Sequence, residues 1–374
     1  MSTVADNWFS LDFSGGQIPC LMDGHSYCAY VTTPAADAPI STPRQSPGRN
    51  VLNVTIFLLV LGVSCVALGR FQPFWPVPNV VQRFQYFTAQ MEKFDTIFIG
   101  SSRILNQVIP RQFDAENAAR GVSTHSLSLG YSGMWPPESY YFLRQLLAQH
   151  PRHLRWVVIE LMDDRFVPME RGTPTLRMVY WHDWKHTGMA IRFVMESSKP
   201  LLEKAQQLAW HTGLFLHRMA NAGRGVDWWR AIFFPKKDKA DKSWIETAGF
   251  YPVKVGQWGA RARADFAQEI LAFQQSPLQR LRPGLASAVR DLIGEVRRAG
   301  AEPVFVLPPS VRPEEKLGEG WPPGTVVWAF NDPAEYPRLF LPELRHDLTH
   351  LDEDGAREFT SLLAQRFSDL ARQR

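Results

Sequence analysis

Residues 51–69 form an uncharged, largely apolar run that constrains this chain more than any other feature. An α-helix rises 1.5 Å per residue, so a run of this length covers most of the ~30 Å hydrocarbon core of a bilayer. Only a few polar side chains interrupt it, which disfavours a core helix of a soluble protein. The run is long and follows some 50 residues, which disfavours a cleaved signal peptide. We therefore expect residues 51–70 to be a single transmembrane signal anchor.

The flanks of this run predict its orientation. Residues 1–50 are rich in Ser, Thr, Pro, Ala and Gly without a sustained period, which is typical of a disordered tail. Arg44 and Arg49 precede the span and Arg70 follows it, so the positive-inside rule favours a cytoplasmic tail. Residues 71–90 begin with aromatics and prolines and are expected to form a juxtamembrane linker. The large domain would then be extracytoplasmic (periplasmic), held at the inner or plasma membrane.

Composition excludes several kinds of function. The 41 basic and 37 acidic residues leave a net charge of +4, which is scattered and does not indicate nucleic-acid binding. The three cysteines all precede the large domain, which therefore has no disulfide, thiol nucleophile or cysteine metal site: Cys20, Cys28 and Cys65. Three histidines further on lack a tight ligand pattern: His186, His211 and His217. No phosphate-binding glycine pattern follows the first strand, so we expect neither a metal nor a cofactor.

Residues 91–374 alternate short apolar runs with helical patterns. Strands are expected at residues 96–99, 125–129, 155–161, 303–307 and 325–330. Helical spacing lies between them and after residue 352. This order predicts an α/β fold with a mostly parallel five-stranded sheet in a three-layer α/β/α arrangement. Residues from about 165 to 280 break the alternation, and we interpret them as a helical insertion that caps the carboxyl edge of the sheet.

A pair of hydroxyls follows the first predicted strand. Gly100, Ser101 and Ser102 form a predicted turn at the carboxyl end of that strand, where open α/β sheets place their chemistry. A serine needs a base before it becomes a nucleophile, and that base can come from far along the chain. Asp347 and His350 supply a candidate just before the last predicted helix.

This layout resembles the SGNH (GDSL-like) hydrolases over about residues 90–372, apart from the insertion. The resemblance implies that Ser102 is the nucleophile, His350 the general base and Asp347 the residue that orients it. It also implies that Gly133, in a Leu-Gly-Tyr-Ser-Gly segment after the second strand, is an oxyanion donor. The Gly-Ser-Ser variant is similar to that of membrane-anchored relatives in cell-envelope acyl transfer, such as D-alanyl transfer and alginate O-acetylation proteins.

The sequence departs from the family pattern after the third strand. Asp164 occupies the place at which the family carries a donor Asn for the oxyanion. An ionised carboxylate accepts hydrogen bonds and donates none, so Asp164 is a doubtful member of the oxyanion hole. His346 is a competing base, but its spacing to Asp347 does not match the family motif.

These residues predict a serine esterase or O-acyltransferase that acts on acyl esters of a cell-envelope or extracellular polysaccharide, alongside a membrane acyltransferase. An alternative is a catalytically silent scaffold or binding partner in a polysaccharide acylation or export complex. A third hypothesis, an esterase active on lipids, depends on an aromatic cluster in the insertion: Trp228, Trp229, Phe233 and Phe234.

Overall fold

The computed structural model describes residues 47–71, 78–162, 175–221, 224–233 and 243–374. Its contacts divide the chain into two units, residues 1–56 and residues 57–374. The second unit contains the sheet and every described candidate site residue. Cys20 and Cys28 lie outside the described residues.

Helix α1 (Pro47–Phe71) contains the predicted membrane span. Its segment Gly48–Arg70 is long and apolar enough to cross a membrane. None of the residues in its most apolar window is buried. The predicted apolar helix is therefore confirmed.

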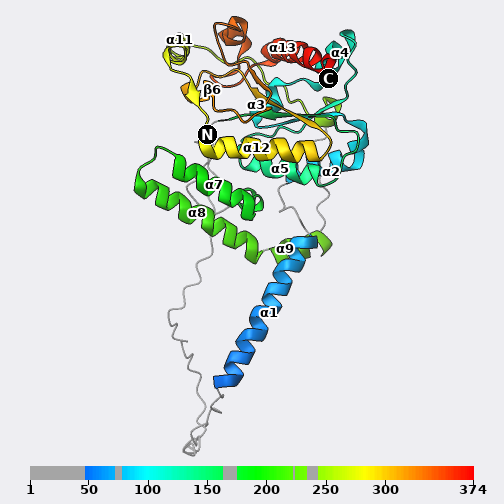
Figure 1. Ribbon diagram of the computed structural model, residues 1–374, viewed down its shortest axis with the longest axis vertical. Coiled ribbons are helices and arrows are strands. Elements are labelled where there is room, and N and C mark those ends of the chain that lie inside the picture. Colours follow the sequence, from blue (N-terminus) through cyan, green and yellow to red (C-terminus); the bar gives the residue numbers. More distant parts are fainter. Residues whose placement is uncertain (1–46, 72–77, 163–174, 222–223, 234–242) are drawn as a thin grey trace, which may run out of the picture. The chain divides into compact units, whose positions relative to one another are not determined.

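Five parallel strands form the main sheet (Figure 1). They lie in the order β2 (Ser126–Ser128), β1 (Thr96–Ile99), β3 (Trp156–Glu160), β5 (Glu302–Leu307) and β7 (Val327–Ala329). Each neighbouring pair is parallel. All five predicted strands are confirmed, since buried β-branched runs are a strong signal. The chain runs outward in opposite directions from β1 and β3, so the loops that follow these two strands diverge, as at ligand sites of open α/β sheets.

Side chains of the strands alternate between two apolar clusters. Ile97, Ile99 and Phe305 join one cluster with residues of α5 (Glu138–Leu147) and α12 (Pro283–Arg298). Phe98 and Val306 join the other with residues of α4 (Pro110–Ala119) and α13 (Glu353–Arg372). The strands of a parallel sheet that is buried on both faces have continuous apolar sequences, and this pattern predicted these strands.

The prediction of a linker over residues 71–90 is wrong for its second part. Helix α2 occupies Pro78–Gln90, and its Val80 and Phe87 side chains are fully buried in the first apolar cluster. Val80, Phe84 and Phe87 have helical spacing, and Pro78 fits a first helical turn. The packed domain therefore begins by residue 78.

The insertion is helical over most of its described length, with α6 (Leu176–Tyr180), α7 (Trp184–Glu196), α8 (Leu201–Ala220), α9 (Arg224–Phe233), α10 (Ser243–Glu246) and α11 (Ala260–Gln275). Helix α7 packs against α8, α12 and α5, so this part lies on helices that cover the sheet. Helices α7 and α8 therefore do not cap the carboxyl edge as expected, whereas residues 250–258 of the insertion contact α3 and the loop before α13 at that edge.

A small parallel pair, β4 (Gln279–Arg280) and β6 (Leu317–Glu319), was not predicted. The remaining elements are α3 (Ser102–Gln107) and four short 3₁₀ turns, Met91–Lys93, Pro313–Glu315, Pro337–Phe340 and Pro342–Leu344.

Candidate active site

Ser102 begins helix α3 directly after the turn that follows β1. The preceding Ser101 is the N-cap, and its Oγ accepts a hydrogen bond from the Arg103 N–H at 3.2 Å. Capping of this kind satisfies a backbone donor that the first turn of a helix leaves free. Gly100 allows the close approach, because a Cβ there would lie 2.4 Å from a Glu160 carboxylate oxygen. The turn therefore presents the half-buried Ser102 at the carboxyl edge of the sheet.

A buried network of charges holds this turn. Glu160, at the end of β3, accepts hydrogen bonds from the Ser101 N–H and from Ser101 Oγ, the latter at 3.1 Å. Arg103 donates its Nε to Glu160 at 2.6 Å and its Nη1 to Glu315 at 2.7 Å. Burial disfavours the charge of Arg103, but the carboxylates of Glu315 and Glu160 outweigh it and raise its pKa above the ordinary value. The residue before Ser102 is thus fixed by the neighbouring strand.

His350 lies beside Ser102. Its Nε2 is 2.8 Å from Ser102 Oγ, and its Nδ1 is 2.9 Å from Asp347 Oδ2. Asp347 Oδ1 also accepts from the backbone N–H groups of Thr349 at 2.7 Å and of His350 at 2.8 Å. The structure therefore brings Ser102, His350 and Asp347 into one hydrogen-bonded chain.

The carboxylate of Asp347 is held in its ionised form. Partial burial opposes ionisation, but hydrogen bonds from the His350 ring and the Thr349 N–H outweigh it and keep the pKa of Asp347 well below its usual range. A carboxylate facing Nδ1 favours the tautomer with a proton on Nδ1. In that tautomer the lone pair of His350 Nε2 accepts the Ser102 hydroxyl proton.

The loop that carries His350 is anchored from two sides. The buried Arg345 guanidinium donates to the carbonyls of Leu339 at 2.7 Å and Leu348 at 2.9 Å. The competing His346 lies elsewhere, with its Nδ1 2.7 Å from the Lys254 carbonyl. The imidazole beside Ser102 is thus that of His350 and not that of His346.

Residues 250–258 form a strap between the two halves of the site. The Tyr251 N–H donates to the Leu105 carbonyl of α3 at 2.9 Å, and the Gly256 N–H donates to the Arg345 carbonyl at 3.0 Å. A Cβ on Gly256 would lie 1.7 Å from the His346 carbonyl oxygen. The strap belongs to the insertion and is the described part of it that contacts both the Ser102 helix and the His350 loop.

Gly133 lies on the loop after β2. The start of this loop lies beside the Ser102 turn. The Leu129 N–H donates to the Phe98 carbonyl at 2.8 Å, and the Tyr131 N–H donates to the Gly100 carbonyl at 3.0 Å. Gly133 has a φ of +66°, a left-handed conformation that favours glycine. Its role as an oxyanion donor stays a prediction.

An arginine that sequence reasoning missed lies beside this loop. Two nitrogens of the Arg177 guanidinium donate to the Glu138 carboxylate at 2.9 and 3.0 Å, and the guanidinium stacks 4.9 Å from the centre of the Tyr131 ring. Its Nη1 is 3.7 Å from the point where a Cβ on Gly133 would lie. Asp164, the doubtful oxyanion residue, lies outside the described residues.

The histidines that were considered as metal ligands make other contacts. His211 Nδ1 is 2.8 Å from His182 Nε2, and His186 Nδ1 is 2.7 Å from an Asp183 carboxylate oxygen. Within the described ranges, no group of three or more His, Cys, Asp or Glu side chains is arranged to hold a metal ion.

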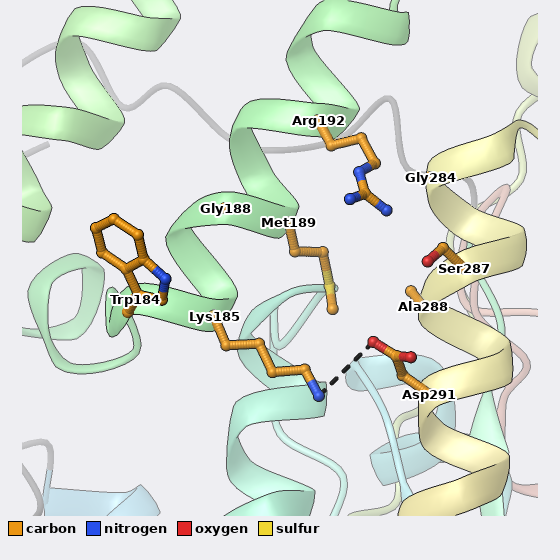
Figure 2. A pocket seen from close by; sticks show the side chains of 9 residues that line it. All are labelled: Trp184, Lys185, Gly188, Met189, Arg192, Gly284, Ser287, Ala288 and Asp291. Carbon is orange, nitrogen blue, oxygen red and sulfur yellow. Dashed lines mark ion pairs between the residues drawn. The ribbon is translucent and has the colours of Figure 1, made fainter.

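A hollow of about 440 Å³ lies between α7 and α12 (Figure 2). Lys185 and Asp291 face each other across it at 3.7 Å, and Met189 and Ala288 contribute apolar surface. None of the predicted site residues lines it. The candidate site residues around Ser102 therefore lie apart from this hollow.

Comparisons with protein-family models, curated proteins and solved structures found nothing that matches this chain.

Proposed function

We propose that the chain is a membrane-anchored SGNH-like serine esterase or O-acyltransferase with the three-layer α/β/α arrangement of that family. The observation that carries this proposal is the hydrogen-bonded chain from Asp347 through His350 to Ser102 at the carboxyl end of β1. A serine, a histidine and a carboxylate in this order are the parts that nucleophilic acyl transfer requires.

The chemistry follows from the direction of these hydrogen bonds. Ser102 Oγ attacks the carbonyl carbon of an acyl ester while His350 Nε2 takes the hydroxyl proton. The tetrahedral intermediate collapses, the His350 proton passes to the departing alcohol, and the acyl group stays on Ser102. Water or a sugar hydroxyl then attacks the acyl carbon while His350 Nε2 takes its proton. The bond from the acyl carbon to Ser102 Oγ breaks, and His350 returns the proton to Ser102.

The negative oxygen of the intermediate needs donors. The Ser102 N–H is at the first turn of α3, and no hydrogen bond to another described residue uses it or the Gly133 N–H. We assign both as oxyanion donors, because preorganised N–H groups meet charge that develops only in the transition state.

The substrate proposal is an acylated polysaccharide of the cell envelope or exterior. Helix α1 supports it, since a membrane anchor would hold the domain next to such polymers. The resemblance to envelope acyl-transfer proteins in the Gly100–Ser102 turn supports it too. In this proposal the domain faces the periplasm, and a membrane acyltransferase is its partner.

The test is labelling of the full chain in detergent with a serine-directed fluorophosphonate, with the adduct mapped by mass spectrometry. Ser102 should be labelled in the folded protein, and labelling should vanish in Ser102→Ala and His350→Ala. Ser276→Ala, which removes a hydroxyl that bonds only its own helix, is the matched control and should label normally. A folded protein without any label at Ser102 would overturn the proposal in favour of a silent scaffold.

A further inference from the structure

The exposed side of α8 carries no charge. The exposed residues of this 20-residue helix are Leu201, Leu202, Ala205, Gln206, Ala209, Thr212, Gly213, Leu216, Met219 and Ala220. They recur at intervals of three and four, so they form one continuous stripe along the helix. The outer face of a helix on a water-soluble domain is normally polar and charged. The charged side chains of α8, including Glu203 and Lys204, lie off this stripe.

Helix α9 also exposes large apolar side chains. Val226, Trp229 and Phe233 are spaced by three and four residues, and each is more than half exposed. The Trp229 and Phe233 rings lie with their centres 4.1 Å apart. Large exposed apolar side chains on two consecutive helices indicate a surface that something covers.

The junction of α8 and α9 contacts the end of the anchor. Asn221 donates its Nδ2 to the Cys65 carbonyl at 2.6 Å, and Cys65 Sγ donates to the Ala220 carbonyl at 3.0 Å. Cys65 lies in the last turns of the segment Gly48–Arg70, where an anchor leaves the hydrocarbon. The chain from Phe71 at the end of α1 to Pro78 at the start of α2 can span no more than about 25 Å. The start of the packed domain therefore stays near the end of the anchor.

We propose that α8 and α9 lie in the surface layer of the bilayer beside α1, with their exposed apolar sides toward the lipid acyl chains. Amphipathic helices bind this layer through apolar stripes, and Trp and Phe are favoured there. We infer that lipid covers the stripe because its end at Ala220 contacts the last turns of the anchor. This inference concerns placement of the domain and depends on no catalytic activity.

The test uses the full chain at one copy per lipid nanodisc, with Cys20, Cys28 and Cys65 replaced by Ser. An environment-sensitive fluorophore is attached at Leu216→Cys or Phe233→Cys, and spin-labelled lipids serve as quenchers. Leu61→Cys reports insertion of α1, and Ala118→Cys, an exposed position on α4, is the matched control. We expect blue-shifted emission and quenching several-fold stronger at positions 216 and 233 than at 118.

Equal, weak quenching at positions 216, 233 and 118, with strong quenching at 61, would overturn the proposal. Blue-shifted emission at 216 and 233 without quenching by lipid would also overturn it, since protein would then cover the stripe. A Trp229→Glu, Phe233→Glu double variant should reduce quenching at position 216 while circular dichroism stays unchanged. The fluorescence readout stays informative even if no ester is ever cleaved.

Discussion

Glu160 accepts a hydrogen bond from the backbone N–H of Ser101, so the strand beside β1 fixes the residue that precedes the proposed nucleophile. The same carboxylate accepts a hydrogen bond from Nε of Arg103, the residue that follows Ser102. A positioning role predicts effects on turnover that exceed effects on substrate binding.

We expect Glu160→Gln to lower kcat for ester cleavage about 10- to 100-fold with little change in KM, as expected when a positioned group shifts. It should also destabilise the fold by about 3 kcal/mol, since Arg103 loses one of its two buried partners. Steady-state kinetics and urea unfolding measure both. Glu302→Gln, on a partly exposed carboxylate at the start of β5, should change neither. An unchanged kcat in Glu160→Gln would refute the positioning role.

Asp347→Asn should lower kcat about 10³- to 10⁴-fold, because an amide no longer favours the tautomer with its proton on His350 Nδ1. The low pKa of Asp347 means that its own protonation should not shape the pH profile above pH 4. Pre-steady-state acylation kinetics with a chromogenic ester will measure the loss. Activity within tenfold of the parent would exclude Asp347 as the orienting residue.

Gly133→Ala tests the oxyanion loop. A side chain at φ +66° costs about 1 kcal/mol, and the shifted N–H should lower kcat/KM about 10²-fold. Gly121→Ala is the control, because φ there is +81° and no atom lies within 4 Å of the added Cβ. Both variants should lose similar stability in thermal unfolding. Comparable activities in the two would show that the Gly133 N–H is not a donor.

Gly256→Ala tests the strap. The added Cβ would meet the His346 carbonyl oxygen at 1.7 Å, so the loop that carries His350 must move. We expect fluorophosphonate labelling of Ser102 to slow at least about tenfold. Gly259→Ala, which has open space around its Cβ, should label at the parental rate. Identical labelling rates would mean that the strap does not position the base.

Acid should destabilise the insertion. Burial lowers the pKa of His211 to about 4, and burial also lowers the pKa of His182. Protonation of such groups favours the unfolded chain, so their contribution to stability is complete above about pH 6.5 and is lost as the pH falls toward 4. For His211 alone this is about 3 kcal/mol.

Urea unfolding at pH 7.5 and pH 5 measures this loss. His211→Gln should flatten the pH dependence, whereas His125→Gln, at an exposed position, should leave it unchanged. A pH dependence that is identical in the parent and in His211→Gln would contradict the assignment.

The sequence predicted the central sheet because its strands are buried on both sides and read as unbroken apolar runs. It missed α2, whose helical spacing follows a proline-rich segment, and it missed β4 and β6, which have no apolar pattern. The partners of Arg103 lie 57 and 212 residues away, so no local pattern joins them. The available signal was a charged residue at the end of the buried run of β3, Glu160, and another shortly after the buried run of β1, Arg103. The sequence offered His350 as a candidate base, and the resemblance assigned it to Ser102.

The separation of 248 positions between Ser102 and His350 also has a consequence for biosynthesis. Helix α13 follows the His350 loop and packs on α3 and α4. A nascent chain that has folded only its first strands therefore carries a serine with no base beside it. Under the proposed function, translation and export would be finished before any molecule gained a reactive hydroxyl, so incomplete chains would pass through the secretion machinery chemically inert.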